Sequence, residues 1–192
     1  MSDALLPGSR WLLPGAELLL AALIAVDPHR VTKRLVGAER DLRAGSLGLV
    51  GLVALANSYV LVRLIDQLVG GGGNGRDLLA AAAGVWLTNV VVFALAYWEL
   101  DRGGPFGRAH KRGVHHTVDL WFPQNGDAAA IAPDWSPVFV DYLFVSLTAS
   151  TAFSPTDTMP LTPQAKLLMG AQSLVSLLTV GLVAARAVNI LG

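Results

Sequence analysis

Long apolar runs separated by short polar stretches constrain this chain more than any other feature of its sequence. The runs over 44–67, 78–99 and 164–190 are each longer than the roughly 20 residues that a helix needs to cross a bilayer. A fourth run, 11–26, is of marginal length and contains a proline and a glutamate. Only helices and closed barrels span a bilayer, and no stretch alternates as a barrel strand does. The sequence therefore predicts an all-α integral membrane protein with four transmembrane helices, located in the cell membrane as a multi-pass protein.

The composition agrees with this class and excludes several others. The chain has 192 residues, of which 53% are hydrophobic and 15% charged, whereas about a quarter of a soluble domain is charged. Its 14 basic and 14 acidic residues balance, so it has no basic footprint for nucleic acid. The sequence contains no cysteine, which excludes disulfides, thiolate metal sites and cysteine nucleophiles. The partner that the composition predicts is the lipid bilayer.

A shorter apolar run precedes the last predicted span. The run over 138–150 is shorter than the roughly 20 residues that a spanning helix needs. Ser136 and Pro137 are suited to be the N-cap and the first residue of a helix, and Pro155 breaks the pattern beyond it. The spacing predicts a helix over 137–150 that enters the membrane without crossing it, which is a re-entrant half-helix.

Hydroxyl-bearing side chains cluster where this half-helix is expected to end. Irregular backbone at membrane depth persists only where protein or a water-filled cavity satisfies its amide groups. The turn is therefore predicted to line a pore or pocket. Its polar residues are Ser150, Thr151, Ser154, Thr156, Asp157 and Thr158.

Two further features place polar or small residues inside predicted spans. Small residues recur mostly every three positions in the last span, and they form a face that is either packed against a helix or pore-lining. This face consists of Gly170, Ser173, Ser176, Thr179 and Gly181. Asn89 lies midway along the span 78–99, where an amide without a partner costs several kcal/mol. Asn89 and Thr148 are therefore expected not to face lipid, and both a helix-to-helix hydrogen bond and a pore role remain open for Asn89.

The polar segment over 99–136 raises the question of a metal site. Three histidines, His110, His115 and His116, precede Asp119 with the spacing H-x4-HH-x2-D. This spacing matches no established set of metal ligands, so no metal is predicted. The aromatic residues of the segment are expected to hold it against the bilayer interface. They are Trp121, Phe122 and Trp135.

The region over 78–191 resembles the pore module of two-transmembrane potassium channels. The likeness is most specific in FVSLTASTAFSPTDTMPLT, which lies over the family pattern F-x-x-x-T-L-T-T-V-G-Y-G-D-x-x-P-x-T. Anchored on Asp157, Pro160 and Thr162, it places 152–156 where the family has its filter. The same region, with LWFPQ upstream, is also similar to a family of uncharacterised bacterial integral membrane proteins. The resemblance implies an outer span, a polar loop, a pore half-helix, a filter and an inner span.

The sequence departs from the channel family where the chemistry lies. Ser154 and Thr156 replace two glycines of the filter, and Pro155 fixes its own backbone and removes an amide. A column of backbone carbonyls is therefore not expected. Side-chain hydroxyls and a ring of Asp157 carboxylates would instead form a constriction that attracts cations if four copies meet on an axis.

Charge bias and the channel analogy predict opposite orientations. The loop over 27–43 carries five basic residues and the segment over 99–136 carries four, whereas Arg76 is alone in the loop between them. The positive-inside rule therefore places both basic loops in the cytoplasm, with the half-helix entering from that side. In potassium channels it enters from the other side.

These observations lead to two hypotheses about function. The first is a channel-like protein, a cation channel with the non-standard filter AFSPTD, which assembles as a homo-oligomer, preferably a tetramer, and passes monovalent cations. The alternative is a non-conducting accessory or structural membrane protein with a pore-module fold. In both, 1–76 forms an N-terminal helical hairpin region with two spans and 77–192 forms the pore-like module. The chain is not predicted to be an enzyme, and no catalytic residue, cofactor or metal is expected.

The channel hypothesis assigns two sets of residues. The ion pathway and filter-like segment would consist of Thr148, Ser150, Thr151, Ala152, Phe153, Ser154, Pro155, Thr156 and Asp157. The pore-lining helix would contribute Gly170, Ser173, Ser176 and Thr179.

Overall fold

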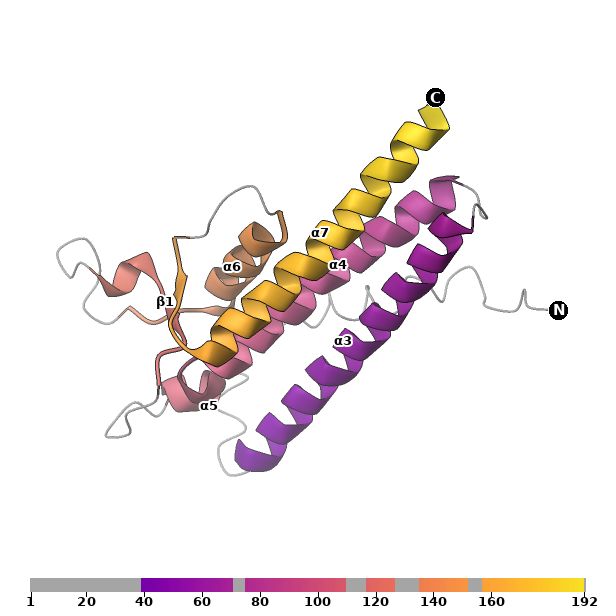
Figure 1. Cartoon of the computed structure of the whole chain (residues 1–192). Helices are drawn as coiled ribbons and strands as arrows, with labels where there is room; N and C mark the ends of the chain where they lie inside the picture. Colours follow the sequence, from indigo (N-terminus) through magenta and orange to yellow (C-terminus); the bar gives the residue numbers. More distant parts are fainter. Residues whose placement is uncertain (1–38, 71–74, 110–116, 127–134, 152–156, 192) are drawn as a thin grey trace.

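The computed structural model describes residues 39–70, 75–109, 117–126, 135–151 and 157–191, and this part of the chain is mostly helical. Figure 1 shows the elements in chain order. They are α3 (Glu39–Val69), α4 (Gly75–Leu100), η1 (Asp101–Gly103), α5 (Gly104–Ala109), β1 (Leu120–Trp121), η2 (Pro123–Asn125), α6 (Phe139–Thr151), β2 (Met159–Pro160) and α7 (Pro163–Leu191).

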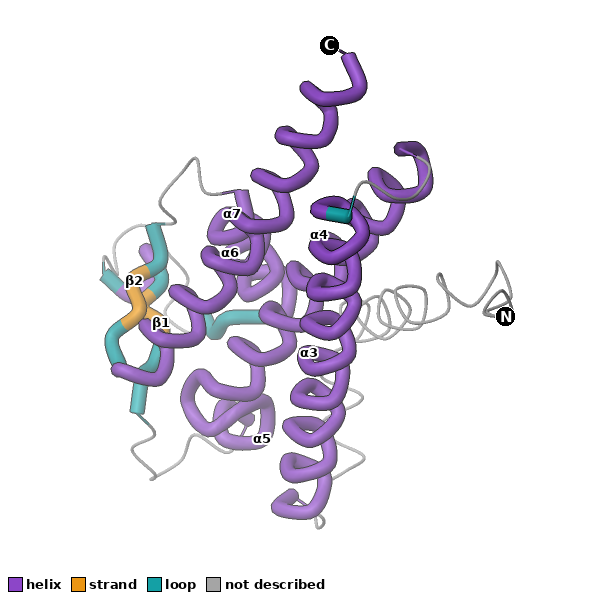
Figure 2. The backbone as a smooth tube through the Cα atoms, turned by 45° about the vertical axis from the view of Figure 1, so that its right-hand side comes forward, coloured by secondary structure: helices purple, strands orange, loops and turns teal. Residues whose placement is uncertain are grey.

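Of the three long helices, α4 packs against both α3 and α7, whereas α3 and α7 contact each other little (Figures 1 and 2). Each of the three forms most or all of a segment long and apolar enough to cross a membrane. The segments are Ala44–Gln67, Arg76–Gly103, which includes η1, and Pro163–Ala185. These segments confirm three of the predicted helices. The fourth predicted span, 11–26, lies outside the described residues.

The central helix of the bundle is α4. In the most apolar stretch of α4, 56% of the residues are buried inside the chain. In the corresponding stretches of α3 and α7 the share is 17%. It packs against α3 on one side and against α6 and α7 on the other. On α3, Leu61 and Leu64 are buried and the Asn57 amide donates to the Val85 carbonyl at 3.3 Å. The other helices are therefore positioned by their contacts with α4.

A turn of left-handed backbone ends α4. Arg102, Gly103 and Gly104 have φ values of 54°, 76° and 80°, a region that glycine adopts readily and other residues rarely do. The Arg102 side chain supports its own unusual conformation, since Nη2 donates to Asn125 Oδ1 at 2.9 Å and Nε lies 3.5 Å from Asp101 Oδ2. The turn directs the chain out of the bundle and into α5.

The short helix α6 runs antiparallel to α4 and parallel to α7. The ring of its first residue, Phe139, packs edge-on against the Trp98 ring, with the ring centroids 5.9 Å apart. Near the end of α6, the Ser150 carbonyl accepts a hydrogen bond from Trp86 Nε1 at 3.3 Å. Trp86 lies near the middle of α4, so α6 covers about half of that helix. Every third or fourth residue of α6 is buried, as expected for a helix packed on one face. The buried residues are Phe139, Tyr142, Val145, Ser146 and Ser150.

The start of α6 differs from the prediction by two residues. Ser136 and Pro137 were expected to be the N-cap and the first helical residue, but the helix begins at Phe139. The reason lies in Asp141, whose carboxylate accepts from the Val138 amide at 2.7 Å. Asp141 thus satisfies a free amide at the helix start, in the way that an acid at the third position of a capping box does.

A two-stranded antiparallel sheet returns the chain to the end of the bundle at which α6 begins. Leu120 pairs with Pro160 and Trp121 with Met159. Thr162 follows as the N-cap of α7, because its hydroxyl oxygen accepts from the Ala165 amide at 3.3 Å and Pro163 begins the helix. The helices α6 and α7 therefore start at the same end of α4.

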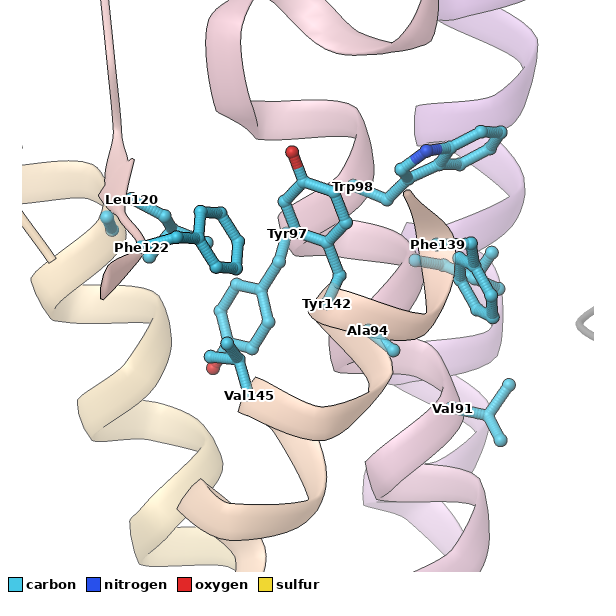
Figure 3. Close-up of a cluster of buried hydrophobic side chains, with 11 residues drawn as sticks. Val91, Ala94, Tyr97, Trp98, Leu120, Phe122, Phe139, Tyr142 and Val145 are labelled. Carbon is cyan, nitrogen blue, oxygen red and sulfur yellow. The ribbon is translucent and has the colours of Figure 1, made fainter. Parts of the chain in front are cut away.

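Aromatic side chains fill the core at this end, where Figure 3 shows rings from α4, α6 and the loop segments gathered together. The Phe122 ring packs edge-on against the Tyr142 ring, with the ring centroids 5.4 Å apart, and its centroid lies 5.7 Å from that of the Trp135 ring. Phe122, which was expected at the bilayer interface, is only 3% exposed. It is buried because the loop packs on the start of α6.

Candidate functional site

A fully buried glutamine, Gln172 of α7, joins its own helix to α4 and to α6. Its Oε1 accepts a hydrogen bond from the Tyr97 hydroxyl of α4. Its Nε2, with two hydrogens, has three acceptors within hydrogen-bond distance: the Ser146 carbonyl at 2.8 Å, Ser146 Oγ at 2.6 Å and Ser150 Oγ at 2.7 Å. Polar groups inside an apolar bundle require such partners, since a buried unpaired group costs about 1–3 kcal/mol. Gln172 is therefore the centre of a polar cluster between α4, α6 and α7.

A second polar contact lies next to this cluster. Asn89 of α4 is 2% exposed, and its Nδ2 donates to Ser176 Oγ of α7 at 2.8 Å. The prediction that Asn89 does not face lipid is confirmed. Thr148 also satisfies its own hydroxyl, which donates to the Val145 carbonyl at 2.9 Å and the Phe144 carbonyl at 3.0 Å.

The carbonyls at the end of α6 accept hydrogen bonds from three side chains. The last four carbonyls of a helix have no partner within the helix. Here Thr151 Oγ1 donates to the Thr148 carbonyl at 2.9 Å and Ser173 Oγ to the Ala149 carbonyl at 3.3 Å. Trp86 Nε1 donates to the Ser150 carbonyl at 3.3 Å. Donors from α4, α6 and α7 thus satisfy an end that would otherwise require water.

The other end of α6 is fixed by Asp101, which is fully buried. Its Oδ2 accepts from the Tyr142 hydroxyl at 2.7 Å. Its Oδ1 accepts from the backbone amides of Asp119 at 3.0 Å and Leu120 at 3.2 Å. One carboxylate at the end of α4 therefore holds both the start of α6 and the strand β1.

A second cation besides Arg102, Arg108 of α5, is buried close to Asp101. Its Nη1 donates to the carbonyls of Trp98 at 2.8 Å and Asp101 at 2.7 Å, and its guanidinium lies 5.0 Å from the centre of the Tyr142 ring. Burial lowers the pKa of Arg108, while the negative charges of Asp101 and Glu99 act in the opposite direction. A guanidinium remains protonated in proteins, so the cluster combines fixed positive and negative charges.

The described residues of the predicted pathway differ in their exposure. Ser150 is buried against Gln172, whereas Thr151 and Asp157 are exposed. The predicted filter-like residues Ala152, Phe153, Ser154, Pro155 and Thr156 lie outside the described residues.

The small residues of α7 do not share one environment. Ser176 and Thr179 are buried within the chain, and the Thr179 hydroxyl donates to the Val175 carbonyl at 2.8 Å. Ser173 is half-buried against the end of α6, and Gly170 is exposed. The surfaces of α7 that are free for other contacts therefore include Gly170 but not the hydroxyls of Ser176 and Thr179.

The segment with the histidines supplies one described residue of the candidate metal set. Asp119 Oδ1 accepts from the Thr162 hydroxyl at 2.6 Å, which holds β1 to the start of α7. His110, His115 and His116 lie outside the described residues. Within the described ranges, no three acidic, histidine or cysteine side chains form a group that could hold a metal ion.

Comparison of the chain with models of known families, with characterised proteins and with solved structures yields no match. The resemblance to potassium-channel pore modules therefore stays an expectation from the sequence.

Proposed function

We propose that this chain is a channel-like membrane protein in which α6 is a re-entrant half-helix and several copies surround a pathway for monovalent cations. The dimensions of α6 support the first part. Its 13 residues extend about 20 Å, against roughly 30 Å for the hydrocarbon core of a bilayer. The start of α6 and the strand β2 both lie at the Asp101 end of α4. A half-length helix followed by a return to the same end has the topology of a re-entrant segment.

The observation that carries the proposal is the set of donors at the end of α6. A helix that ends in water needs no protein donors for its last carbonyls, but one that ends at membrane depth does. The carbonyls of Thr148, Ala149 and Ser150 all accept from side chains. This arrangement suits a helix whose end lies away from bulk water.

The chemistry of the exposed groups beyond α6 favours cations. The Thr151 hydroxyl donates its proton to the Thr148 carbonyl, so its oxygen offers lone pairs to the outside. Asp157 is exposed on the returning segment. The end of a helix also carries a partial negative charge. Hydroxyl oxygens, a carboxylate and a helix C-terminus together would attract cations and repel anions, as acidic rings do in cation channels.

A pathway requires more than one copy, and the exposed side of α7 is the surface that we assign to its wall. The hydroxyls of Ser176 and Thr179 are used inside the subunit, so they are poor candidates for contact with ions. Gly170 and Leu174 lie on the exposed side of the same helix. Four copies around an axis would place this side and Asp157 towards the centre.

The alternative is a non-conducting accessory protein, and the Gln172 cluster favours it. In that cluster the buried polar groups of Gln172, Ser146 and Ser150 find their partners on residues of the same chain. The half-helix is therefore fixed without any neighbouring copy, as an accessory protein would require.

Reconstitution of the full chain in liposomes distinguishes the two functions. We expect the wild type to pass K⁺ and the Asp157→Asn variant to pass it several-fold more slowly, because the ring would lose its charge. The control is Asp66→Asn, which removes an exposed carboxylate at the end of α3 and should leave the flux unchanged.

The mass of the detergent-solubilised particle and its thermal stability complete the test. Four copies per particle, with equal thermal stability of the wild type and Asp157→Asn, support the channel. A monomer that passes no cations in either form removes the channel proposal in favour of the accessory function.

A further inference from the structure

The hydrogen bonds of Gln172 form a chain with a single direction through three helices. The Ser146 hydroxyl donates to the Val90 carbonyl of α4 at 2.6 Å, so its oxygen must accept from Gln172 Nε2, which lies 2.6 Å away. The opposite end of the same amide, Oε1, accepts from Tyr97 of α4. The bonds therefore run from α4 to α7, from α7 to α6 and from α6 back to α4.

This closed arrangement restricts how α6 and α7 move relative to each other. A sliding or rotation of α7 that separates Gln172 from Ser146 leaves the buried Gln172 amide without its acceptors on Ser146, which is unfavourable inside an apolar bundle. The neighbouring contact from Ser173 to the Ala149 carbonyl links the same turn of α7 to the same turn of α6. The two helices are thus joined most strongly at the end of α6.

The two ends of α6 are held by different partners. At its start, Tyr142 bonds to Asp101 at the end of α4. Towards its end, Ser146 and Ser150 bond to Gln172 of α7. A change at Gln172 therefore acts on the end of α6 while the attachment at Tyr142 persists.

We propose that Gln172 is the positioning residue that couples α7 to the end of α6, so that a displacement of α7 is transmitted through Ser150 to the exposed Thr151. The effect on ion passage rests on the proposed function. The mechanical coupling between the two helices does not, because it follows from hydrogen bonds within one chain.

Amide hydrogen exchange of the full chain in detergent tests the coupling directly. The variant is Gln172→Leu, which keeps a side chain of similar size and removes both the donor and the acceptor. We expect exchange to rise about tenfold at residues 147–151, which corresponds to the loss of one or two buried hydrogen bonds. Exchange around Tyr142 and in α3 should change little. The matched control is Gln164→Leu, since Gln164 is exposed on the same helix and should have no effect.

A milder variant keeps the proposal testable if Gln172→Leu does not fold. Tyr97→Phe removes only the donor to Gln172 Oε1 and should give a smaller rise at the same residues. Unchanged exchange at 147–151, or an equal rise throughout α3, α4 and α6, would overturn the proposal.

The second measurement is the ratio of K⁺ flux to Na⁺ flux in liposomes. Both fluxes fall together when less protein is folded, so the ratio is independent of the amount of folded protein. Gln172→Leu should change this ratio and Gln164→Leu should preserve it. A protein that passes no ions would contradict the proposed function, whereas the exchange result would still decide the coupling between α7 and α6. Altered exchange with an unaltered ratio would contradict the transmission beyond Ser150.

Discussion

Asn89 and Ser176, which are 87 positions apart in the chain, are joined by a 2.8 Å hydrogen bond between Asn89 Nδ2 and Ser176 Oγ. The bond connects the middle of α4 to α7 in a region where both side chains are buried. It fixes the position of α7 along α4, next to the backbone carbonyl of Gln172, which lies 3.5 Å from the same nitrogen.

Replacing Asn89 tests the value of this bond inside the bundle. Asn89→Leu should lower the free energy of unfolding, because it leaves the Ser176 hydroxyl without its donor. A double-mutant cycle with Ser176→Ala should give a coupling of about 0.6 kcal/mol and at most about 1.7 kcal/mol, the range found for hydrogen bonds between membrane helices. The measurement is chemical unfolding in detergent. A coupling of zero would mean that the two side chains do not interact.

Tyr142→Phe tests the attachment of α6 at its start. The Tyr142 hydroxyl donates to Asp101, a fully buried carboxylate, at 2.7 Å. A hydrogen bond to a charged group contributes about 1.5–3 kcal/mol, and the free energy of unfolding should fall by that amount. Tyr59→Phe, at an exposed position of α3, serves as the control and should have no effect. Equal stability of both variants would show that the hydroxyl of Tyr142 contributes nothing.

Arg108 should be hard to replace because it is the buried cation beside Asp101 and Glu99. Arg108→Met removes its hydrogen bonds to the carbonyls of Trp98 and Asp101, each contributing about 1.5–3 kcal/mol, and should lower the free energy of unfolding by about 3–6 kcal/mol. Arg108→Lys keeps the charge but not the planar group that lies 5.0 Å from the Tyr142 ring, so its loss should be intermediate. Arg63→Met is the exposed control. Thermal unfolding of the three variants gives the order, and a neutral Arg108→Met would refute it.

The Thr162 hydroxyl makes two hydrogen bonds, and two variants distinguish its contribution from that of the rest of the side chain. Its hydroxyl caps α7 and donates to Asp119 Oδ1 at 2.6 Å. Thr162→Val keeps the shape and should lower the free energy of unfolding by about 2 kcal/mol. Thr162→Ser retains the hydroxyl and should restore most of that loss. Equal losses in the two variants would assign the effect to the methyl group.

The long helices could be predicted from the sequence because apolar length alone determines them. The predicted spans 44–67, 78–99 and 164–190 correspond to the apolar segments Ala44–Gln67, Arg76–Gly103 and Pro163–Ala185. The half-length helix was also predicted, since its apolar run is too short to span. The exact start of this helix was not predicted, because the Val138 amide at the helix start is satisfied by Asp141, which lies beyond the expected cap Ser136.

The partners of the buried polar residues could not be predicted, because helical periodicity shows that a face exists but not which helix covers it. Gln172 was missed although it is an amide in the interior of an apolar span, which is itself a signal of a buried partner. Its contact with Tyr97 joins residues 75 positions apart. Asp101 was not singled out either, and its partners are Tyr142 and two backbone amides from a distant part of the chain.

The Gln172 cluster also determines the order in which the site can be assembled. In a chain synthesised from its N-terminus, α4 and α6 are complete before α7 emerges from the ribosome. Until then the Tyr97 hydroxyl lacks its acceptor and Ser150 lacks the amide that reaches it. Addition of the last helix is therefore the step that fixes α6 in place, and a ribosome that stalls before Gln172 would leave α6 without its central partner.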